Sequence, residues 1–473
     1  MELSDESEDF RDRLSTISEQ GDRVWVYPKK PKGRLYKRRI WFSYSLLLLF
    51  FAGPFIKIKG DPILLLNIIE RKFIIFGIIF WPQDFYLLVL SMIFLIVFIV
   101  LFTVIYGRLF CGWVCPQTVF MEFVYRQVEY LIEGNNNKQR KLDNQPWDFE
   151  KIWKKSAKHL VFLAFSLITI CTFVAYIFGV DELGQMVANH FTTSRVLMFV
   201  MIGLTGAHYF IFAKFREQVC IIACPYGRLQ GVLLDRNSIQ VSYDYKRGEP
   251  RGKHNPLENR ETSGKGDCIE CGSCEVVCPT GIDIRNGSQL ECINCTACMD
   301  ACDAVMTRIN RPKGLIRYAS ERTISEGTHL KFNGRVMFYT VVLTGLLGLI
   351  AYLFTIRTEV ETTILRVQGS LFQEYDSLHI SNIYVIQVVN KTRKELPINV
   401  ILEEPNGEIK MMGNTLLVKK GEMGEANFLV VLPKAELKSS QTKIEFKIVS
   451  GEKEIEEVES TFNGPLELNK KHQ

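Results

Sequence analysis

Eight cysteines in one short segment have the clearest capacity for chemistry. They form the pattern C-x2-C-x2-C-x3-C twice, from Cys268 to Cys278 and from Cys292 to Cys302. This is the spacing of bacterial two-cluster ferredoxins, in which the fourth cysteine of each run binds the cluster of the other run. The spacing therefore predicts two [4Fe–4S] clusters, the first held by Cys268, Cys271, Cys274 and Cys302 and the second by Cys292, Cys295, Cys298 and Cys278.

Zinc is the main alternative partner for so many thiols. Zinc ribbons also use C-x2-C, but normally as two separated pairs, which does not explain two runs with 2-2-3 spacing. Two neighbouring clusters would pass single electrons, and we expect the fold of this segment to depend on them. Gly272 and Gly281 suit a close approach of the backbone. Asp303 stands where the first run has Pro279, which we expect to change the surroundings of the second cluster.

A second set of four cysteines occurs in two C-x3-C-P motifs. Each motif follows a long apolar stretch and has an arginine shortly before it, Arg108 in one copy and Arg216 in the other. Cysteines at i and i+4 share one side of a helix, so we expect the four thiols to converge at one membrane face. The arginines would favour the thiolate form. The motifs consist of Cys111, Cys115 and Pro116, and of Cys220, Cys224 and Pro225.

Thiolates bind soft ions such as Cu(I) and also iron–sulfur centres, so these four cysteines are candidate redox residues and metal ligands. The alternative is that they are small packing residues followed by a proline that ends a helix. Two copies at equivalent places favour the redox interpretation and indicate an internal repeat of two spans. Cys171 is expected to pack as a small apolar residue. His208 is either a functional ionisable group in the membrane or a hydrogen-bonded packing residue.

Long apolar stretches must position these motifs. Five stretches approach the roughly 20 apolar residues that a spanning helix needs. A sixth, 62–81, has Glu70, Arg71 and Lys72 near its centre, where each charge costs about 2.5–3.5 kcal/mol. We therefore expect 57–84 to form a lipid-facing or re-entrant loop. The predicted spans are 40–56, 85–106, 159–180, 196–214 and 335–355.

The placement of lysine and arginine predicts the orientation of these spans. The segment 29–39 contains seven basic residues and no acidic one, and the 107–158 and 215–334 connections are also basic. The 181–194 connection has no lysine or arginine. Because basic loops stay in the cytoplasm, we expect a cytoplasmic N-terminus and a C-terminal domain outside. Membrane orientation also explains the basic loops without a nucleic-acid partner.

The C-terminal part has a different pattern from the rest of the chain. After residue 356, short apolar–polar alternations are separated by turn signals, and about seven strands in this length fit an immunoglobulin-like sandwich. The 13 cysteines of the 473-residue chain all lie before it, mostly in tight clusters, which excludes a disulfide scaffold. The predicted parts are a polar cytoplasmic tail (1–39), a four-span core with both C-x3-C-P motifs (40–236), a cytoplasmic region (237–334) with a ferredoxin domain at about 258–310, a fifth transmembrane helix (335–355) and an immunoglobulin-like periplasmic domain (356–473).

In the order of these parts the chain resembles the FixG/CcoG/RdxA family, the accessory proteins of cbb3-type cytochrome c oxidase. The resemblance rests on the two C-x3-C-P motifs, the run 268–302, the last span and the terminal sandwich. Membrane ferredoxins of nitrate and nitrous-oxide pathways share the core but are not expected to carry the tail domain. The predicted fold class is therefore a multi-domain membrane polyferredoxin: a polytopic α-helical core of about five spans, an inserted 2[4Fe–4S] segment and an all-β sandwich.

The resemblance implies a role in maturing the copper–haem oxidase in the bacterial inner (cytoplasmic) membrane. It implies reduction of Cu(II) to Cu(I), with a cytoplasmic electron donor and with copper chaperones or oxidase subunits as partners. The copper contacts carried over from the family are Cys111, Cys115, Cys220 and Cys224. Two other functions stay open, namely a quinone-linked electron conduit and a non-catalytic assembly scaffold. No Gly-rich nucleotide loop is present, so the sequence implies no nicotinamide site.

Overall fold

The computed structural model divides the chain into two units, Met1–Asn67 with Leu88–Gly348, and Ile68–Leu87 with Leu349–Gln473. The structure describes residues 16–465 except 19, 59, 69–71, 190–191, 193–194, 256–259, 261–262, 328–333, 368, 370, 393, 414–415, 438 and 452. Glu70 and Arg71, which were part of the reason for predicting a loop at 57–84, lie outside the described residues.

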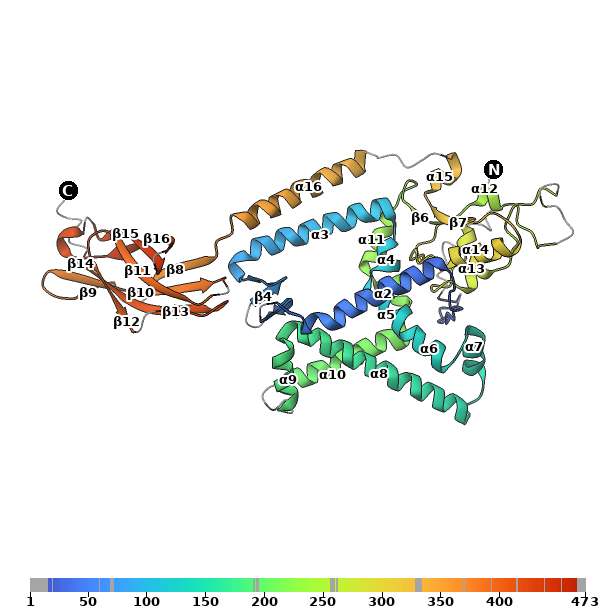
Figure 1. Cartoon of the computed structure of the whole chain (residues 1–473), viewed down its shortest axis with the longest axis horizontal. Helices are drawn as coiled ribbons and strands as arrows, with labels where there is room; N and C mark the ends of the chain where they lie inside the picture. The colour runs from blue at the N-terminus through green and yellow to red at the C-terminus, as the bar shows by residue number, and fades with distance from the viewer. Residues whose placement is uncertain are drawn as a thin grey trace. The chain divides into compact units, whose positions relative to one another are not determined.

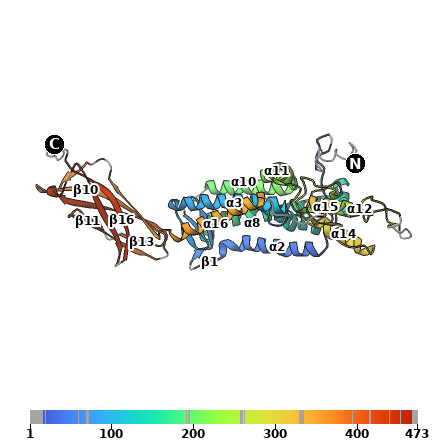
Figure 2. The same cartoon turned by 90° about the horizontal axis from the view of Figure 1, so that it is seen from above.

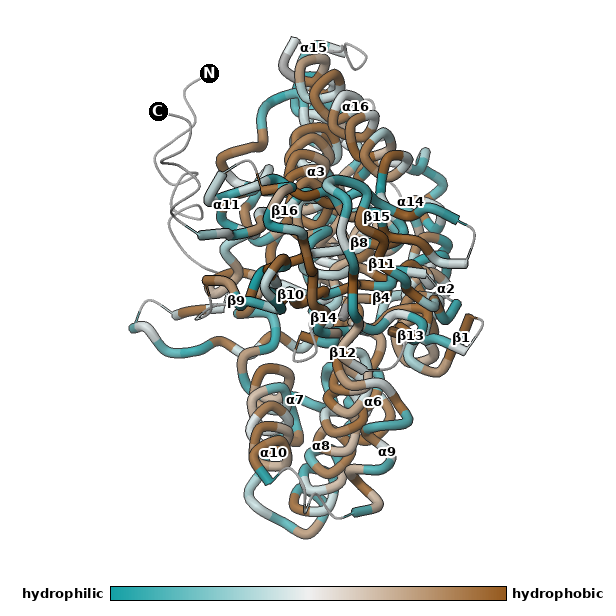
Figure 3. The backbone as a smooth tube through the Cα atoms, turned by 90° about the vertical axis from the view of Figure 1, so that its left-hand side faces the viewer, coloured by the Kyte–Doolittle hydropathy of each residue, from teal (hydrophilic) through white to brown (hydrophobic). Residues whose placement is uncertain are grey.

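Four helices in the described part of the chain are long and apolar enough to cross a membrane. They agree with four of the five predicted stretches, and hydrophobic residues predominate along α3, α10 and α16 (Figure 3). Helices α8 and α10 lie side by side (Figures 1 and 2), joined by a cluster around Ile170, Val174 and Met201. The helices are α3 (Phe85–Tyr106), α8 (Phe149–Phe178), α10 (Arg195–Phe210), continued by the π-helical η5 (Ile211–Phe215), and α16 (Gly334–Thr355).

The remaining predicted stretch, 40–56, belongs to a shorter helix, α2 (Arg34–Ala52). Its first two turns are basic, and a 3₁₀ turn with a proline at its start, η2 (Gly53–Phe55), follows directly. Only the later part is apolar, and the helix packs through Tyr36 and Leu47 in a core with Phe123 and Phe162. Because charges and proline limit its apolar length, α2 is not among the helices that satisfy the criteria for a span.

The segment 57–84 contains short strands and no spanning helix in its described residues. Strands β4 and β5 pair as an antiparallel hairpin, with Phe73 opposite Phe80. Its turn, Phe76-Gly77, has positive φ at both positions, as two-residue hairpin turns require. The prediction that this apolar segment does not span as a helix agrees with the structure. The strands are β1 (Lys57–Ile58), β2 (Asp61–Pro62), β3 (Leu64–Asn67), β4 (Lys72–Ile75) and β5 (Ile78–Phe80), followed by η3 (Pro82–Asp84).

The cysteine runs lie in a segment with little regular structure. Two short strands, β6 (Gln240–Tyr243) and β7 (Ile316–Ala319), pair antiparallel and bracket it. Helices α13 (Ser273–Val276) and α14 (Ala297–Arg308) contact each other (Figure 1). The other helices of this region are η7 (Ile284–Asn286), α12 (Tyr245–Gly248) and α15 (Glu321–Glu326).

Short helices surround the two C-x3-C-P motifs. Residues of α5, η4 and α8 share a core with α2 that includes Phe120, Tyr125 and Phe162. Pro116 and Pro225 each begin a helix, a position at which proline is tolerated. The elements are α4 (Leu109–Trp113), α5 (Pro116–Phe120), the π-helical η4 (Met121–Tyr125), α6 (Arg126–Ile132), α7 (Asn136–Asn144), α9 (Val180–Ala188), the π-helical η6 (Val219–Ala223) and α11 (Pro225–Leu233).

The C-terminal domain is a two-sheet sandwich, as predicted. One sheet has the order β12-β14-β10-β8 with β9 beside β10, and the other has the order β13-β11-β15-β16. Tyr384, Phe428 and Phe446 meet in the core with ring centroids 5.4–5.6 Å apart. The sandwich has nine strands in the described residues, compared with the expected number of about seven. The strands are β8 (Val360–Arg366), β9 (Gln373–Glu374), β10 (His379–Asn390), β11 (Leu396–Glu404), β12 (Glu408–Met412), β13 (Leu416–Val418), β14 (Met423–Pro433), β15 (Gln441–Ser450) and β16 (Lys453–Asn463), with η8 (Lys434–Glu436) after β14.

Candidate functional site

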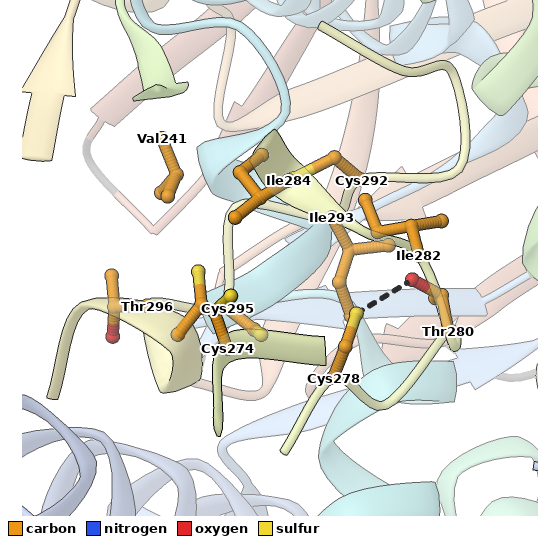
Figure 4. A pocket seen from close by; sticks show the side chains of 11 residues that line it. Val241, Cys274, Cys278, Thr280, Ile282, Ile284, Cys292, Ile293, Cys295 and Thr296 are labelled. Carbon is orange, nitrogen blue, oxygen red and sulfur yellow. Dashed lines mark hydrogen bonds between the residues drawn. The ribbon is translucent and has the colours of Figure 1, made fainter. Parts of the chain in front are cut away.

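The eight ferredoxin-type cysteines surround two neighbouring cavities. The first is lined by Cys268, Cys271, Cys274 and Cys302. The second is lined by Cys278, Cys292, Cys295 and Cys298 (Figure 4), and Cys274 also lies in its wall. In each cavity the fourth thiol comes from the opposite run, so the grouping is the one expected from the spacing.

The donor set and its arrangement fit a cubane cluster in each cavity. Thiolates are the usual ligands of [4Fe–4S] clusters. No group of three or more His, Cys, Asp or Glu side chains among the described residues is close enough to hold a single metal ion. A zinc ion would require thiolates about 2.3 Å from one centre, whereas thiols set around a cavity suit a group larger than one ion.

The two runs shape their ligand loops with the same backbone conformation. Glu270 and Asn294 stand at equivalent places with φ of 53° and 54°, and Gly272 and Thr296 follow with 64° and 66°. Positive φ is uncommon outside glycine, especially for a β-branched residue such as Thr296. The third cysteine of each run then falls in the first turn of α13 or α14. The repeated turns thus direct three thiols of each run from one short loop.

Burial keeps the thiols of Cys274 and Cys302 protonated when no metal is bound. It raises the pKa of Cys274 to about 12, with a further contribution from Asp283. Burial likewise raises the pKa of Cys302 to about 12, and the thiol of Cys274 adds to it. Metal binding must therefore release protons, because only the thiolate is a ligand.

The position of Asp303 differs from the expectation. It follows Cys302, which lies at the first cavity, so the replaced proline borders the first cavity and not the second. Without a proline, α14 continues through Asp303 to Arg308. The Asp303 carboxylate accepts a hydrogen bond from the backbone N–H of Gly314 at 2.9 Å and so ties down the following loop.

The C-x3-C-P motifs share one local structure, which is not the single helix that we expected. Cys111 and Cys220 lie inside short helices, α4 and η6, whereas Cys115 and Cys224 are the extended N-cap residues of α5 and α11. A residue before proline is disfavoured in the helical region. Each helix therefore breaks between its two cysteines, and the i, i+4 prediction is wrong in this detail.

The four C-x3-C-P thiols nevertheless lie near one another. Burial is the main cause that raises the pKa of Cys111 to about 11, and the neighbouring thiols of Cys115 and Cys224 contribute to this rise. Burial raises the pKa of Cys220 to about 12, followed by the effects of Cys115, Cys111 and Cys224. The Cys111 thiol also donates to Oε1 of the fully buried Gln230 at 3.4 Å. The two motifs thus bring their four thiols near one another, although no three of them lie close enough to hold a single metal ion in this structure; we call these four thiols the thiol cluster.

Of the two arginines, Arg108 lowers the pKa of Cys111 as predicted, but burial outweighs its effect. Arg108 donates to the carbonyl oxygens of Leu290 and Gly227. Arg216 donates hydrogen bonds from Nη1 and Nη2 to the two carboxylate oxygens of Glu129, at 3.1 and 3.0 Å. Their hydrogen bonds hold segments together, so desolvation decides the protonation state.

The second cavity borders the thiol cluster directly. Cys111 packs against Ile293, Cys295 and Val277 in one apolar group. A Cβ added at Gly112 would overlap the carbonyl oxygen of Ile293. The Gly112 carbonyl accepts from Nε of the fully buried Arg39 at 2.7 Å. The glycine therefore allows backbone contact between the C-x3-C-P turn and the loop of the second cavity.

Arg126 forms a second bridge between the C-x3-C-P region and the loop of the second cavity. Its buried guanidinium donates to the carbonyl oxygen of Pro279, next to Cys278, at 2.9 Å. It pairs with Glu122 one helical turn earlier and with Glu217 at 3.4 Å. A small cavity beside it is lined by Cys220, Pro279 and Thr280, among others. The Glu122–Arg126 spacing of i, i+4 was the signal available in the sequence.

The other candidates have packing roles. The His208 ring lies 3.3 Å from the Tyr125 hydroxyl through Nδ1 and packs with Phe120 and Phe212. Cys171 packs with the apolar cluster of α8 and α10. Neither residue lines one of the cysteine cavities, so the structure favours a packing role for both.

Three family models match this chain. A 4Fe-4S dicluster domain matches residues 215–321, which include the second C-x3-C-P motif and both cysteine runs. A 4Fe-4S binding domain matches residues 88–136, around the first C-x3-C-P motif. The model described as the IG-like fold at the C-terminal of FixG matches residues 350–465. These matches support iron–sulfur clusters and the fold of the terminal sandwich.

Named relatives resemble the chain over much of its length. Protein RdxA of Cereibacter sphaeroides is 36% identical over 391 residues, which cover 79% of this chain and 81% of that protein. Nitrogen fixation protein FixG of Rhizobium meliloti is 36% identical over 303 residues, covering 62% of this chain and 57% of FixG. Protein RdxB of Cereibacter sphaeroides is 34% identical, covering 80% and 81%.

A solved structure also resembles the chain. The crystal structure of a FixG-related protein from Vibrio parahaemolyticus is 26% identical, covers 23% of this chain and 100% of that chain, and has a TM-score of 0.21. The long matches to RdxA and RdxB, together with the domain order, identify the chain. It belongs to the FixG/RdxA family and is a membrane-associated iron–sulfur electron-transfer protein.

Proposed function

We propose that the chain passes electrons from a cytoplasmic donor, through two [4Fe–4S] clusters, to the four C-x3-C-P thiols, where Cu(II) is reduced to Cu(I). The first cluster would be held by Cys268, Cys271, Cys274 and Cys302, and the second by Cys278, Cys292, Cys295 and Cys298. Bound there, the clusters supply one-electron transfer. The observation that carries the proposal is the contact of Gly112 and Cys111 with the Ile293 loop.

The burial of the ligands supports a direction for the electron path. Cys271, at the first cavity, is exposed, whereas Cys295 at the second is buried beside Cys111. A protein donor would therefore have access to the cysteines that would hold the first cluster, and Cys295, which would hold the second, lies beside Cys111 of the thiol cluster.

The thiol cluster suits copper as a substrate. Thiolates are soft ligands that favour Cu(I), and the apolar surroundings of Cys111 and Cys220 disfavour free thiolate charge. Cu(II) would gain one electron while the reduced cluster loses one. The Cu(I) product then leaves for copper chaperones or for subunits of a cbb3-type oxidase during its assembly.

The charge placement supports a location in the bacterial inner membrane. Asp84, at the start of the Pro82–Tyr106 span, accepts from Arg357 at 2.7 Å, just after the Val336–Thr355 span. It also accepts from Lys391 of the sandwich at 2.9 Å. These span ends thus share one side, which we propose is the periplasm. The other end of the first span leads into Gly107 beside Asn294 of the cluster loops, on the cytoplasmic side.

The test uses full-length protein purified and reduced without oxygen. Mixing it with Cu(II) should reoxidise the clusters, seen as recovery of their visible absorbance, and yield one Cu(I) per electron. A variant with serine at Cys111, Cys115, Cys220 and Cys224 should keep its iron but lose the reaction, and Cys171→Ser is the matched control. Reoxidation by copper at an unchanged rate in the four-serine variant would contradict the proposal. A quinone analogue that reoxidises this variant would favour the electron conduit.

A further inference from the structure

A large polar cavity lies beside the membrane helices, away from the cysteines. It measures about 440 Å³ and is enclosed by the polar ends of α8 and η5, by α6 and α7, and by Trp25 and Tyr27. We call it the basic cavity. Its side chains include no cysteine, and the electron path proposed above does not use it. Its charged side chains are Lys151, Lys155, Lys158, Lys214, Arg216, Glu129, Glu133 and Asp143.

Positive charge is in excess in this wall. Five basic side chains face three acidic ones. Lys155 pairs with Glu133 at 2.8 Å and Lys158 pairs with Glu133 at 2.9 Å, while Arg216 occupies Glu129. The adjoining Glu217 is itself paired with Arg23 and Arg126. The nearby carboxylates are thus already engaged, and two positive charges remain uncompensated.

Two lysines carry this excess. The buried Lys151 amine donates to the carbonyl oxygens of Asp143 and Gln145, at 2.9 and 2.7 Å, and lies 4.9 Å from the centre of the Trp147 ring. Lys214 is exposed and faces the Trp25 ring at 6.0 Å. Neither forms an ion pair with a carboxylate in the described part of the chain. A buried or half-enclosed ammonium without a counter-ion favours an anionic ligand.

Exposed aromatic side chains close to Lys151 in the sequence indicate that this end of α8 lies at a membrane surface; of the three, Trp147 lines the cavity. Trp147, Phe149 and Trp153 are 74%, 84% and 66% exposed at the start of α8. Exposed tryptophan is typical of the membrane–water interface, where its ring lies at headgroup level. The apolar part of α8 follows within the same helix. Basic pockets between membrane helices at this level bind anionic lipid headgroups.

We propose that the basic cavity binds a phosphate-bearing anion at the membrane surface. The ammonium groups of Lys151 and Lys214 would contact the phosphate oxygens, and the rings of Trp147 and Trp25 would flank them. The headgroup of an anionic phospholipid and a soluble phosphate ion share this chemistry. If the ligand is a phospholipid, the exposed side chains of Trp147, Phe149 and Trp153 would contact its acyl chains.

The experiment compares ligands on the full-length protein in detergent. Native mass spectrometry counts retained lipid after exchange into phosphatidylglycerol or phosphatidylcholine, and a thermal-shift titration with inorganic phosphate follows in lipid-free micelles. The variant Lys151→Gln/Lys214→Gln should lower anion affinity about 25-fold, because each lysine near the surface contributes roughly fivefold. Lys138→Gln/Lys141→Gln is the matched control, since both lysines are exposed on α7 and outside the cavity.

The two ligand arms distinguish the sources. Preferential retention of phosphatidylglycerol that the cavity variant loses identifies a membrane lipid, and phosphate binding lost in the same variant identifies a soluble ion. Equal retention of both lipids together with no phosphate binding, or equal losses in both lysine variants, would overturn the proposal. Lys151→Arg should retain the anion. The single change Lys214→Gln, at an exposed residue, should lower the anion affinity about fivefold. This single variant tests the proposal even if the double variant does not fold.

Discussion

The ferredoxin loops and the C-x3-C-P motifs both gather cysteines, but they do so by different means. In the loops, three thiols of each cavity come from one short run with matching backbone turns at Glu270 and Asn294. In the thiol cluster, the two pairs come from distant segments, and buried groups such as Arg108 join them. The comparison teaches that the grouping of the ferredoxin cysteines depends largely on local sequence, whereas the grouping of the C-x3-C-P thiols depends on packing between distant segments.

The largest effect should come from a change in a cluster loop. Cys298→Ser should remove the second cluster and with it about half of the iron, because each [4Fe–4S] cluster uses four thiolates. Cys220→Ser should leave the iron content unchanged. Iron analysis and EPR of anaerobically purified protein measure both. Equal iron loss in the two variants would end the distinction between the two cysteine sets.

Arg126→Gln should be the next most severe change. It leaves Glu122 buried without its cation and removes one of the three cations paired with Glu217, which keeps Arg23 and Arg216; breaking a buried pair costs about 3–5 kcal/mol. Thermal unfolding in detergent measures this loss of stability, and Arg140→Gln, on the exposed face of α7, serves as the control. An unfolding temperature equal to that of the control would show that the network does not hold the second cluster loop to the core.

Gly112→Ala tests the contact between the first C-x3-C-P turn and the Ile293 loop of the second cavity. The added methyl would overlap the Ile293 carbonyl oxygen, and overpacking of this kind costs about 1–3 kcal/mol. We expect full iron content but slower reoxidation of the clusters by Cu(II). Gly206→Ala, where no atom lies within 4 Å, is the matched control. Reduced iron with an unchanged rate per cluster would mean that the contact serves folding and not electron transfer.

The smallest effect concerns the reactivity of the copper-free thiols. Burial raises the pKa of Cys220 to about 12, so the neutral thiol predominates at pH 8 and the reactive thiolate is scarce. Its alkylation rate should rise about tenfold per pH unit beyond pH 9, where an ordinary cysteine of pKa about 8.5 has levelled off. Iodoacetamide labelling with mass spectrometry, in folded and denatured protein, measures this. A plateau below pH 9 in the folded protein would contradict the burial of this thiol.

Some structural features followed from local patterns in the chain. The spacing of the eight cysteines predicted their grouping around two cavities, and apolar length predicted the four spanning helices. Alternation predicted a sandwich of about seven strands, whereas the structure describes nine; β9 is two residues long and exposed, so it offers no alternation to detect. The break in each C-x3-C-P helix also follows from the sequence, because the residue before a proline is disfavoured in the helical region.

The sequence by itself determined which side chains could bind iron and which segments could enter a membrane, since both depend on residues close together along the chain. Only the tertiary structure decided that the second cavity adjoins Cys111, that Arg216 pairs with Glu129, and that Lys151 faces a cavity. These relations join residues from separate segments. They depend on the competing costs of burying charge and filling space, which no spacing rule contains.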